Sequence, residues 1–267
     1  MNSPNPSAPE LKLKSTQVEA RCDEHGPYTA TVHDMTAIGG RVVTTHCPAC
    51  QARDAKAKAD ADLQRTAMQR EQEVRRLLGR AGIPPRFQDR TFGNYTATSM
   101  GQRAALVTCR TFAETWGEQV ERGGSLVLTG GPGTGKTHLA CAVAGFVARE
   151  FLAAPWFGTV TQLLRHIKDT YRRDSDRSEQ SAIDDLVSPD LLIVDEVGVQ
   201  TGSDHEKMLI FEVLNERYQN LRPTILISNL NSTDLEAYIG QRIMDRFREC
   251  GSVVAFDWQS HRGRNAA

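Results

Sequence analysis

A glycine-rich stretch that ends in lysine and threonine, GGPGTGKT at residues 130–137, offers the clearest chemistry in the sequence. Its glycines let backbone N–H groups turn toward phosphate oxygens, because no Cβ obstructs the approach. Lys136 is placed to reach the β- and γ-phosphates of a nucleotide, and the Thr137 hydroxyl is placed to bind Mg²⁺. The predicted nucleotide-binding residues here are Gly130, Gly131, Pro132, Gly133, Thr134, Gly135, Lys136, Thr137 and His138.

An acidic pair follows a second apolar run at residues 191–194. Asp195 at the tip of such a strand can hold the Mg²⁺ shell, and Glu196 can orient and deprotonate an attacking water. The adjacent glutamate favours ATP hydrolysis over nucleotide storage, and the alternative is an acidic strand end that caps the next segment. Asn229 ends a further apolar run and can reach the same water or the γ-phosphate, although Asn is also common in turns.

These residues converge only if strands and helices bring them together. An apolar run precedes the glycine-rich loop, and residues 137–151 carry apolar side chains at helical spacing, which would aim a helix amino terminus at the phosphates. Further strand-like and helical segments alternate at 154–159, 161–171, 191–194, 204–220 and 224–229. The alternation predicts an α/β fold with a parallel sheet flanked by helices and a ligand at the strands' carboxyl ends. The guanine-reading N-K-x-D motif of GTPases does not follow, which argues against a GTPase. No acceptor pocket for a small-molecule kinase is identifiable.

Two short pairs of metal-ligand residues lie near the amino terminus, Cys22-x-x-His25 and Cys47-x-x-Cys50. Thiolates and an imidazole at this spacing are typical of a tetrahedral structural Zn²⁺ site. A module of about 30 residues buries too little apolar surface to fold alone, so metal binding would supply its folding energy. The alternative is four reduced side chains without metal.

The fourth ligand and the local fold of this module are less constrained. His25 is favoured, with His33 and His46 as alternatives. The stretch between the pairs is rich in β-branched residues and contains Gly39-Gly40, which suits a zinc-ribbon hairpin.

Composition divides the remaining chain and limits its partners. The 267 residues carry a net charge of −1, so a nucleic-acid site must be local. No apolar run is long enough to span a membrane and no signal core is visible, which favours a cytoplasmic protein. The predicted parts are a disordered leader at 1–20, a zinc-binding module at 21–51, a helical linker or partner-binding arm at 52–82 and an ATPase domain at 83–267.

The segment 51–80 is Ala-rich and charged, a helix-forming composition. It is either a solvated linker or an arm that docks on a partner through the late apolar cluster Val74, Leu77 and Leu78. A second helical segment carries Arg242, Arg246 and Arg248. These arginines either reach a neighbouring subunit's γ-phosphate or face solvent, paired with Asp245 and Glu249.

From about Ala81 to Arg264 the sequence resembles the DnaC-type bacterial replicative-helicase loaders, which are AAA+ ATPases. The resemblance rests on GGPGTGKTHLA, LLIVDEVGVQT, the R-I-M-D-R segment and FDWQSHRGR, of which the second and the last are the most specific. It implies an AAA+ P-loop ATPase fold, ATP and Mg²⁺ as cofactors, and slow hydrolysis regulated by DNA or a partner. The implied roles are Walker A for Lys136 and Thr137, Walker B for Asp195 and Glu196, sensor 1 for Asn229, arginine finger for Arg246 beside Arg242, and sensor 2 for Arg262.

Loaders of this type form an open spiral around single-stranded DNA and hold a hexameric DnaB-type helicase ajar. The family's pore-facing segments match Tyr171, Ser203 and His205, and a base can stack on the aromatic rings. Nearby cations for phosphate contacts are Lys168, Arg172, Arg173 and Lys207.

The zinc-ligand pairs resemble those of phage- or prophage-encoded loaders. By analogy, residues 21–80 would bind the helicase. Two alternatives remain: an IstB-type transposition helper ATPase that acts on duplex DNA with a transposase, and a non-hydrolysing zinc adaptor for which ATP is a structural ligand.

Overall fold

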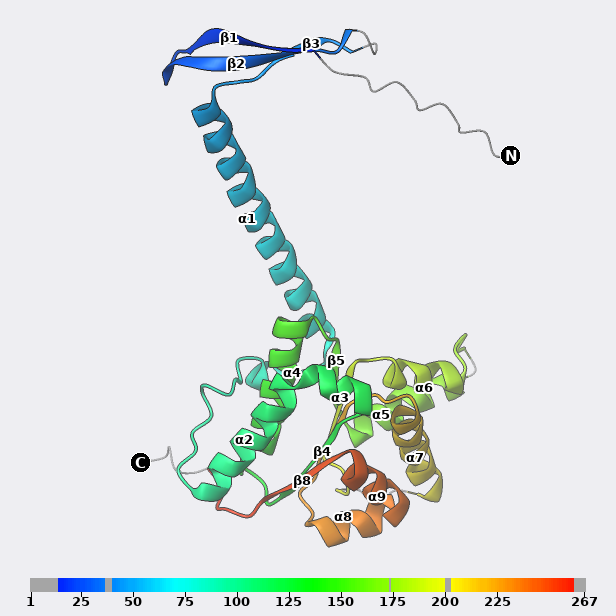
Figure 1. Ribbon diagram of the computed structural model, residues 1–267. Coiled ribbons are helices and arrows are strands. Elements are labelled where there is room, and N and C mark those ends of the chain that lie inside the picture. Colours follow the sequence, from blue (N-terminus) through cyan, green and yellow to red (C-terminus); the bar gives the residue numbers. More distant parts are fainter. Residues whose placement is uncertain (1–13, 37–39, 173, 200–202, 262–267) are drawn as a thin grey trace, which may run out of the picture. The chain divides into compact units, whose positions relative to one another are not determined.

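The computed structural model describes residues 14–36, 40–172, 174–199 and 203–261, and the chain forms two compact units, Met1–Gln69 and Arg70–Ala267 (Figure 1). Within the described residues, no helix is long and apolar enough to cross a membrane.

The first unit contains a three-stranded antiparallel sheet of β1 (Lys14–Cys22), β2 (Gly26–Asp34) and β3 (Val42–Thr44), in that order. Strand β1 pairs with β2 along its whole length, from Lys14 opposite Asp34 to Cys22 opposite Gly26. The predicted disordered leader is therefore wrong for residues 14–20, where the β-branched Thr16 and Val18 suit a strand and the backbone is paired.

The stretch between the two ligand pairs does contain an antiparallel pair, β2 and β3, with Val32 opposite Thr44. The predicted hairpin is thus present, although Gly39 lies outside the described residues. The β1–β2 hairpin was not predicted.

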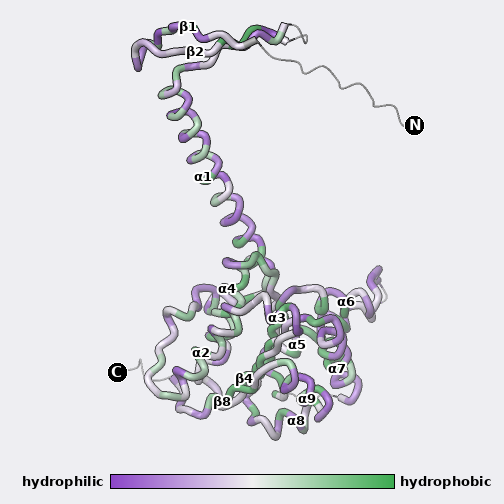
Figure 2. Tube along the Cα trace, viewed as in Figure 1, coloured by the Kyte–Doolittle hydropathy of each residue, from purple (hydrophilic) through white to green (hydrophobic). Residues whose placement is uncertain are grey.

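Helix α1 (Pro48–Arg80) matches the predicted helix and is largely hydrophilic along its length (Figure 2). Its last turns belong to the second unit, where Leu77 is buried and Leu78 packs against the core. The Arg70 guanidinium donates two 2.7 Å hydrogen bonds to the carbonyls of Arg149 and Glu150 at the end of another helix. Leu77 and Leu78 of the late apolar cluster are therefore covered by the second unit itself and are not free to dock a partner.

The second unit is built on a parallel sheet with the strand order β5-β6-β7-β4-β8. The strands are β4 (Ser125–Gly130), β5 (Pro155–Thr159), β6 (Leu191–Asp195), β7 (Thr224–Ile227) and β8 (Gly251–Phe256). The parallel α/β sheet predicted from the alternating segments is confirmed. Because all five strands run the same way, the ends of β4, β6 and β7 lie at one edge.

Helices cover both faces of this sheet, and successive strand residues point into opposite layers. Leu126 and Leu128 of β4 pack with α2 (Met100–Glu114), α3 (Trp116–Arg122) and α4 (Lys136–Phe151). Val127 packs on the other side, with α5 (Val160–Lys168). The same layer holds α6 (Glu179–Val187), α7 (Asp204–Gln219), α8 (Ser232–Ile239) and α9 (Gln241–Cys250). Two short 3₁₀ helices, η2 (Pro85–Phe87) and η3 (Asp169–Tyr171), complete the unit.

Candidate functional site

The glycine-rich loop joins the end of β4 to the start of α4. Gly130 and Gly135 have φ angles of +127° and +100°, a region that side chains rarely adopt. A Cβ on Gly130 would lie 2.2 Å from the Phe256 carbonyl oxygen, and one on Gly135 would lie 2.8 Å from the Tyr95 ring. The loop therefore requires glycine at both positions, and its backbone stays open to a ligand.

Lys136 brings the loop and the end of β7 together. Its Nζ donates to the carbonyls of Gly130 and Gly131 at 2.6 and 2.7 Å and to Asn229 Oδ1 at 3.0 Å. The side chain is 5 % exposed. Lys136 and Asn229 are 93 positions apart in the chain, yet their side chains meet, so both could contact one ligand.

The acidic pair lies at the end of β6, beside the start of α4. Thr137 Oγ1 donates to Asp195 Oδ2 at 2.9 Å, and Asp195 Oδ1 accepts from the Glu196 amide at 2.7 Å. Glu196 is exposed and has a φ of +61°, which is uncommon for a residue with a side chain. Such strained backbone concentrates at functional positions.

A cavity of about 870 Å³ connects these residues, within the range of small-molecule sites. Its lining includes the predicted residues from Pro132 to His138, together with Asp195, Glu196 and Asn229. The segment before the sheet contributes Phe87, Arg90 and Tyr95, which sequence reasoning did not assign. Among the described residues, the Arg90 guanidinium has no hydrogen-bond or ion-pair partner, so the cavity holds a cation that is available to an anionic ligand.

His138 anchors this preceding segment. Its Nε2 donates to the Thr91 carbonyl at 3.0 Å, and its ring meets the Tyr95 ring edge-on with centroids 5.1 Å apart. Burial lowers the pKa of His138; the hydrogen bond to the Thr91 carbonyl opposes this shift, and the charge of Arg90 adds to it.

The carboxyl-terminal segment docks on the glycine-rich loop. Trp258 Nε1 donates to the Thr134 carbonyl at 2.9 Å, and the His261 amide donates to the Gly133 carbonyl at 2.9 Å. Gln102 Nε2 donates to His261 Nε2 at 2.8 Å. Arg262, the predicted sensor 2 residue, lies outside the described residues. The F-D-W-Q-S-H motif therefore supports the loop's carbonyls, a contact that the sequence pattern did not predict.

The three arginines of α9 do not line the cavity, and their surroundings differ. Arg248 forms ion pairs with Glu236 at 2.6 Å and Asp245 at 3.3 Å. The solvent-facing alternative named Asp245 correctly, whereas Glu249 accepts from the Tyr218 hydroxyl instead. Arg246 donates to Asn215 Oδ1 and lies 4.7 Å from the centroid of a tyrosine ring. The Arg242 guanidinium lies 6.0 Å from the centroid of the Phe211 ring.

The predicted DNA-contacting residues gather where η3 meets the start of α7. The rings of Tyr171 and His205 stack with centroids 6.3 Å apart, and their polar atoms lie 3.3 Å apart. Tyr171 is half exposed and donates to Glu179, which raises the pKa of its hydroxyl to about 12. Ser203 instead caps α7, since its hydroxyl accepts from the Glu206 amide.

The nearby cations are less available than predicted. Lys168 Nζ pairs with Glu206 at 2.6 Å, a contact that lowers the pKa of that carboxyl. Arg172 lies 3.8 Å from Asp174, the Lys207 ammonium lies 5.9 Å from a tyrosine ring centroid, and Arg173 falls outside the described residues.

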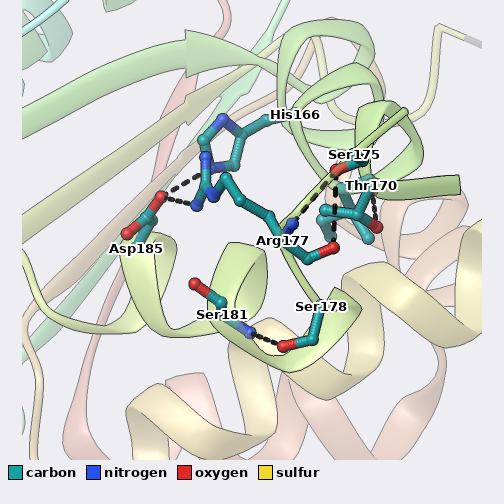
Figure 3. A network of polar contacts seen from close by, with 8 residues as sticks. His166, Thr170, Ser175, Arg177, Ser178, Ser181 and Asp185 are labelled. Atoms are coloured by element: carbon teal, nitrogen blue, oxygen red, sulfur yellow. Dashed lines mark hydrogen bonds and ion pairs between the residues drawn. The ribbon is translucent and has the colours of Figure 1, made fainter. Parts of the chain in front are cut away.

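A polar network holds the segment after Tyr171. Asp185 of α6 accepts from His166 of α5 at 3.1 Å and also pairs with Arg177 (Figure 3). Ser178 caps α6 by accepting from the Ser181 amide at 3.1 Å (Figure 3). The segment before α6 is thus tied at its far end to α6, whose Asp185 also contacts α5.

The two ligand pairs of the first unit come together as one cluster, Cys22, His25, Cys47 and Cys50, with ligand atoms within 4.8 Å of one another. Cys22 Sγ lies 3.6 Å from both His25 Nδ1 and Cys50 Sγ, and Cys50 Sγ lies 3.3 Å from His25 Nδ1. Sulfur atoms around a tetrahedral Zn²⁺ lie about 3.8 Å apart, given Zn–S bonds of about 2.3 Å. The cluster therefore has the dimensions of a zinc site.

The alternative fourth ligands are not part of this cluster. His33 is hydrogen-bonded through Nδ1 to Ser15 Oγ at 2.9 Å.

Hydrogen bonding from His25 lowers the pKa of the Cys22 thiol to about 6. The lowered pKa favours the thiolate over the thiol, and the thiolate is the form that binds metal.

A family model described as IstB-like ATP binding protein matches residues 56–267. The chain belongs to this family. It is 35% identical over 211 residues to the replicative helicase loader DnaC of Escherichia coli (strain K12), which covers 78% of this chain and 84% of that protein. It is 34% identical over 194 residues to the loader DnaC of Buchnera aphidicola subsp. Acyrthosiphon pisum, covering 71% and 76%.

Solved structures place the second unit in the AAA+ fold. The crystal structure of the DnaC helicase loader matches with a TM-score of 0.59 and 24% identity, covering 64% of this chain and 99% of that one. The crystal structure of DnaI matches with a TM-score of 0.55 and 21% identity, covering 65% and 94%. In this fold the glycine-rich loop lies between β4 and α4, and the acidic pair lies at the end of β6.

The IstB-like match begins within α1, so the cysteine and histidine cluster lies before the matched region. The four residues with zinc-site geometry thus lie outside the region that the ATP-binding family model matches.

Proposed function

We propose that this protein is an ATP-dependent loader that places a replicative hexameric helicase of the DnaB type onto single-stranded DNA. The observation that carries the proposal is the cavity at the sheet edge, where Lys136, Thr137, Asp195 and Asn229 converge. The cavity lies in a chain that is 35% identical to helicase loaders over most of its length. A protein that acts on a helicase and DNA would work in the cytoplasm.

The residues fit MgATP. Backbone amides of the glycine-rich loop and Lys136 would hold the phosphates, and Thr137 and Asp195 would hold Mg²⁺, which neutralises charge on the β- and γ-oxygens. Glu196 is exposed in the cavity and would take the proton of the attacking water. Asn229 would orient that water or bind the γ-phosphate.

Hydrolysis would occur between subunits of an open spiral. The cavity's lining contains no arginine of α9, and Arg246 instead donates to Asn215 of α7. We infer that Arg246 reaches the γ-phosphate of the neighbouring subunit as an arginine finger, with Arg242 at the same interface. Tyr171 and His205, stacked on each other, would offer ring faces to the bases of single-stranded DNA, with Ser203 at the same loop.

The cluster in the first unit would hold one Zn²⁺ through Cys22, His25, Cys47 and Cys50. Bound zinc would fix the β1–β2 turn to the start of α1 and supply folding energy to a sheet with little core of its own. We place the helicase contact on this module and the exposed part of α1.

A loading assay tests the proposal. Helicase, circular single-stranded DNA and the loader are mixed with ATP, and DNA-bound helicase is quantified. We expect transfer with the unmodified chain, loss of ATP binding with Lys136→Ala, and binding without hydrolysis with Glu196→Gln. No transfer by an ATP-hydrolysing loader, with helicases from several bacteria and their phages, would refute the function.

The name of the family model favours a second candidate, an IstB-type helper ATPase that assembles on duplex DNA with a transposase. The two functions differ in the DNA that stimulates ATP hydrolysis. Stimulation that rises with duplex length, and is absent with single strands, would select the helper. Stimulation by single strands would select the loader.

A further inference from the structure

We propose that Asn215 and Tyr218 of α7 are positioning residues that hold Arg246 in the direction from which it meets the neighbouring subunit's nucleotide. The inference rests on the proposed role of Arg246 between subunits, and it adds two residues to which no role is otherwise assigned.

Asn215 and Tyr218 of α7 contact Arg246 and Glu249 of α9. Arg246 Nη1 donates to Asn215 Oδ1, and the guanidinium carbon lies 4.7 Å from the centroid of the Tyr218 ring. The Tyr218 hydroxyl donates to Glu249 Oε2 at 2.9 Å. Asn215 and Tyr218 are about one helical turn apart on α7, as are Arg246 and Glu249 on α9. Each residue of one pair can therefore contact the other pair at the same level. The guanidinium is thus fixed by one directional hydrogen bond and one ring face.

The partners of Arg246 restrain its position without cancelling its charge. An amide oxygen and an aromatic ring are neutral, and within the described ranges no carboxylate lies at ion-pair distance from Arg246. Arg248, two residues along α9, is neutralised by two carboxylates. Arg246 is also half-buried, whereas Arg248 is exposed. The structure therefore distinguishes an arginine with a free charge and a restricted direction from an ordinary surface arginine.

Restriction of direction matters for a residue that acts across an interface. A free arginine side chain loses rotamer entropy when it is fixed on a phosphate, and prior fixation by Asn215 and Tyr218 removes part of this cost. The gain appears in the transition state, where charge spreads over the transferred phosphoryl group. Loss of the two contacts should therefore lower kcat and leave the KM for ATP unchanged.

The test compares Tyr218→Leu and Asn215→Leu with the unmodified chain in steady-state ATP hydrolysis by the assembled full-length protein. Each should lower kcat about tenfold, the value of one cation–π contact or charged hydrogen bond in a desolvated site. Tyr218→Phe keeps the ring and should retain at least half of kcat. Arg248→Gln, on the same helix, is the matched control and should leave kcat unchanged.

Two further measurements separate positioning from general damage. In an Arg246→Ala background, Tyr218→Leu should cause no additional loss, because the group that it positions is gone. Mixing Tyr218→Leu with Glu196→Gln subunits should exceed the summed rates of the separate proteins, since the second lends an intact Arg246 to the first. Additive losses, or no gain on mixing, would overturn the proposal.

The outcomes also distinguish failure of this inference from failure of the proposed function. Full kcat for Arg246→Ala would remove the interfacial role of Arg246 itself. A defective Arg246→Ala with unimpaired Tyr218→Leu and Asn215→Leu would leave the interfacial role and remove only the positioning.

Discussion

Thr137 Oγ1 donates a 2.9 Å hydrogen bond to Asp195 Oδ2 across 58 positions of the chain. The contact joins the first turn of α4 to the last residue of β6. Both oxygen atoms are of the type that Mg²⁺ prefers. The two residues predicted to hold one ion therefore already point at each other.

Replacement of Asp195 tests whether this pair holds Mg²⁺. Asp195→Asn keeps an oxygen that can accept from Thr137 but removes the charge that attracts the ion. We expect the Mg²⁺-dependent part of ATP affinity to disappear, a change of about tenfold or more. Titration of a fluorescent ATP analogue with Mg²⁺ and with EDTA measures it. As the control, Asp195→Asn and the unmodified chain should bind the analogue with equal affinity in EDTA. A Mg²⁺ effect that is retained in Asp195→Asn would contradict the assignment.

Arg90 is one of two arginines that line the cavity without an assigned role, the other being Arg86. The Arg90 guanidinium has no partner among the described residues, and its charge contributes to the lowered pKa of His138, directly after Thr137. Arg90→Gln should weaken ATP binding about tenfold, the value of one charge-assisted hydrogen bond. The loss should be smaller for AMP, which carries fewer phosphate charges.

The control for Arg90 is Arg103→Gln, an exposed arginine of α2 outside the cavity. Isothermal titration at two salt concentrations measures all three proteins. An equal loss for AMP and ATP would assign the contact of Arg90 to the AMP part of the nucleotide and not to the β- and γ-phosphates.

Local patterns predicted several elements of the second unit, because its strands are apolar on both faces and its loop needs glycine. Helices α2, α3, α6 and α8 and strand β8 were not predicted. The runs at 191–194 and 224–229 are strands β6 and β7, and the 204–220 segment is α7. The convergence of Lys136, Asn229 and Asp195 was predictable too, since parallel strands end at one edge.

Contacts between distant side chains were not predictable, because they depend on packing and not on spacing. Nothing in the order of residues indicates that Trp258 meets Thr134 or that Arg246 lies over Tyr218. Strand β1 was missed because its polar composition resembles a linker, whereas pairing with β2 decides its structure. The interpretation of Leu77 and Leu78 as a docking surface failed because the core of their own unit covers them.

Arg217 is a buried cation that no sequence pattern predicted. It is 0 % exposed and donates to the carbonyls of Leu186, Val187, Pro189 and Pro223 and to the Thr224 hydroxyl. Its hydrogen bonds tie the end of α6 to the start of β7. Arg217→Met should lower the free energy of unfolding by about 3 kcal/mol, because several buried carbonyls lose their donor.

Denaturant unfolding of Arg217→Met measures this loss, with Arg222→Met as the matched control. Arg222 is partly exposed and pairs with Asp190 at 3.4 Å, so its removal should cost less than about 1 kcal/mol. Equal effects of the two substitutions would show that the buried hydrogen bonds of Arg217 add little to stability.

Metal removal tests the cluster of the first unit. The purified chain should contain about one zinc per molecule, because the four ligand atoms fit one tetrahedral ion. Chelation should expose the β1–β2 hairpin to protease, since the ion fixes Cys22 and His25 to Cys47 and Cys50. ATP affinity should not change, because every residue that lines the nucleotide cavity belongs to the second unit.

A pair of histidine variants assigns the fourth zinc ligand. His25→Ala should lose zinc, because Nδ1 of His25 lies 3.3–3.6 Å from two of the cluster's sulfur atoms. His33→Ala should retain it, because His33 is bonded to Ser15 instead. Metal content by mass spectrometry or atomic absorption decides between them. Zinc that survives His25→Ala but not His33→Ala would show that the imidazole ligand comes from β2, and a metal-free but protease-resistant first unit would remove the zinc site altogether.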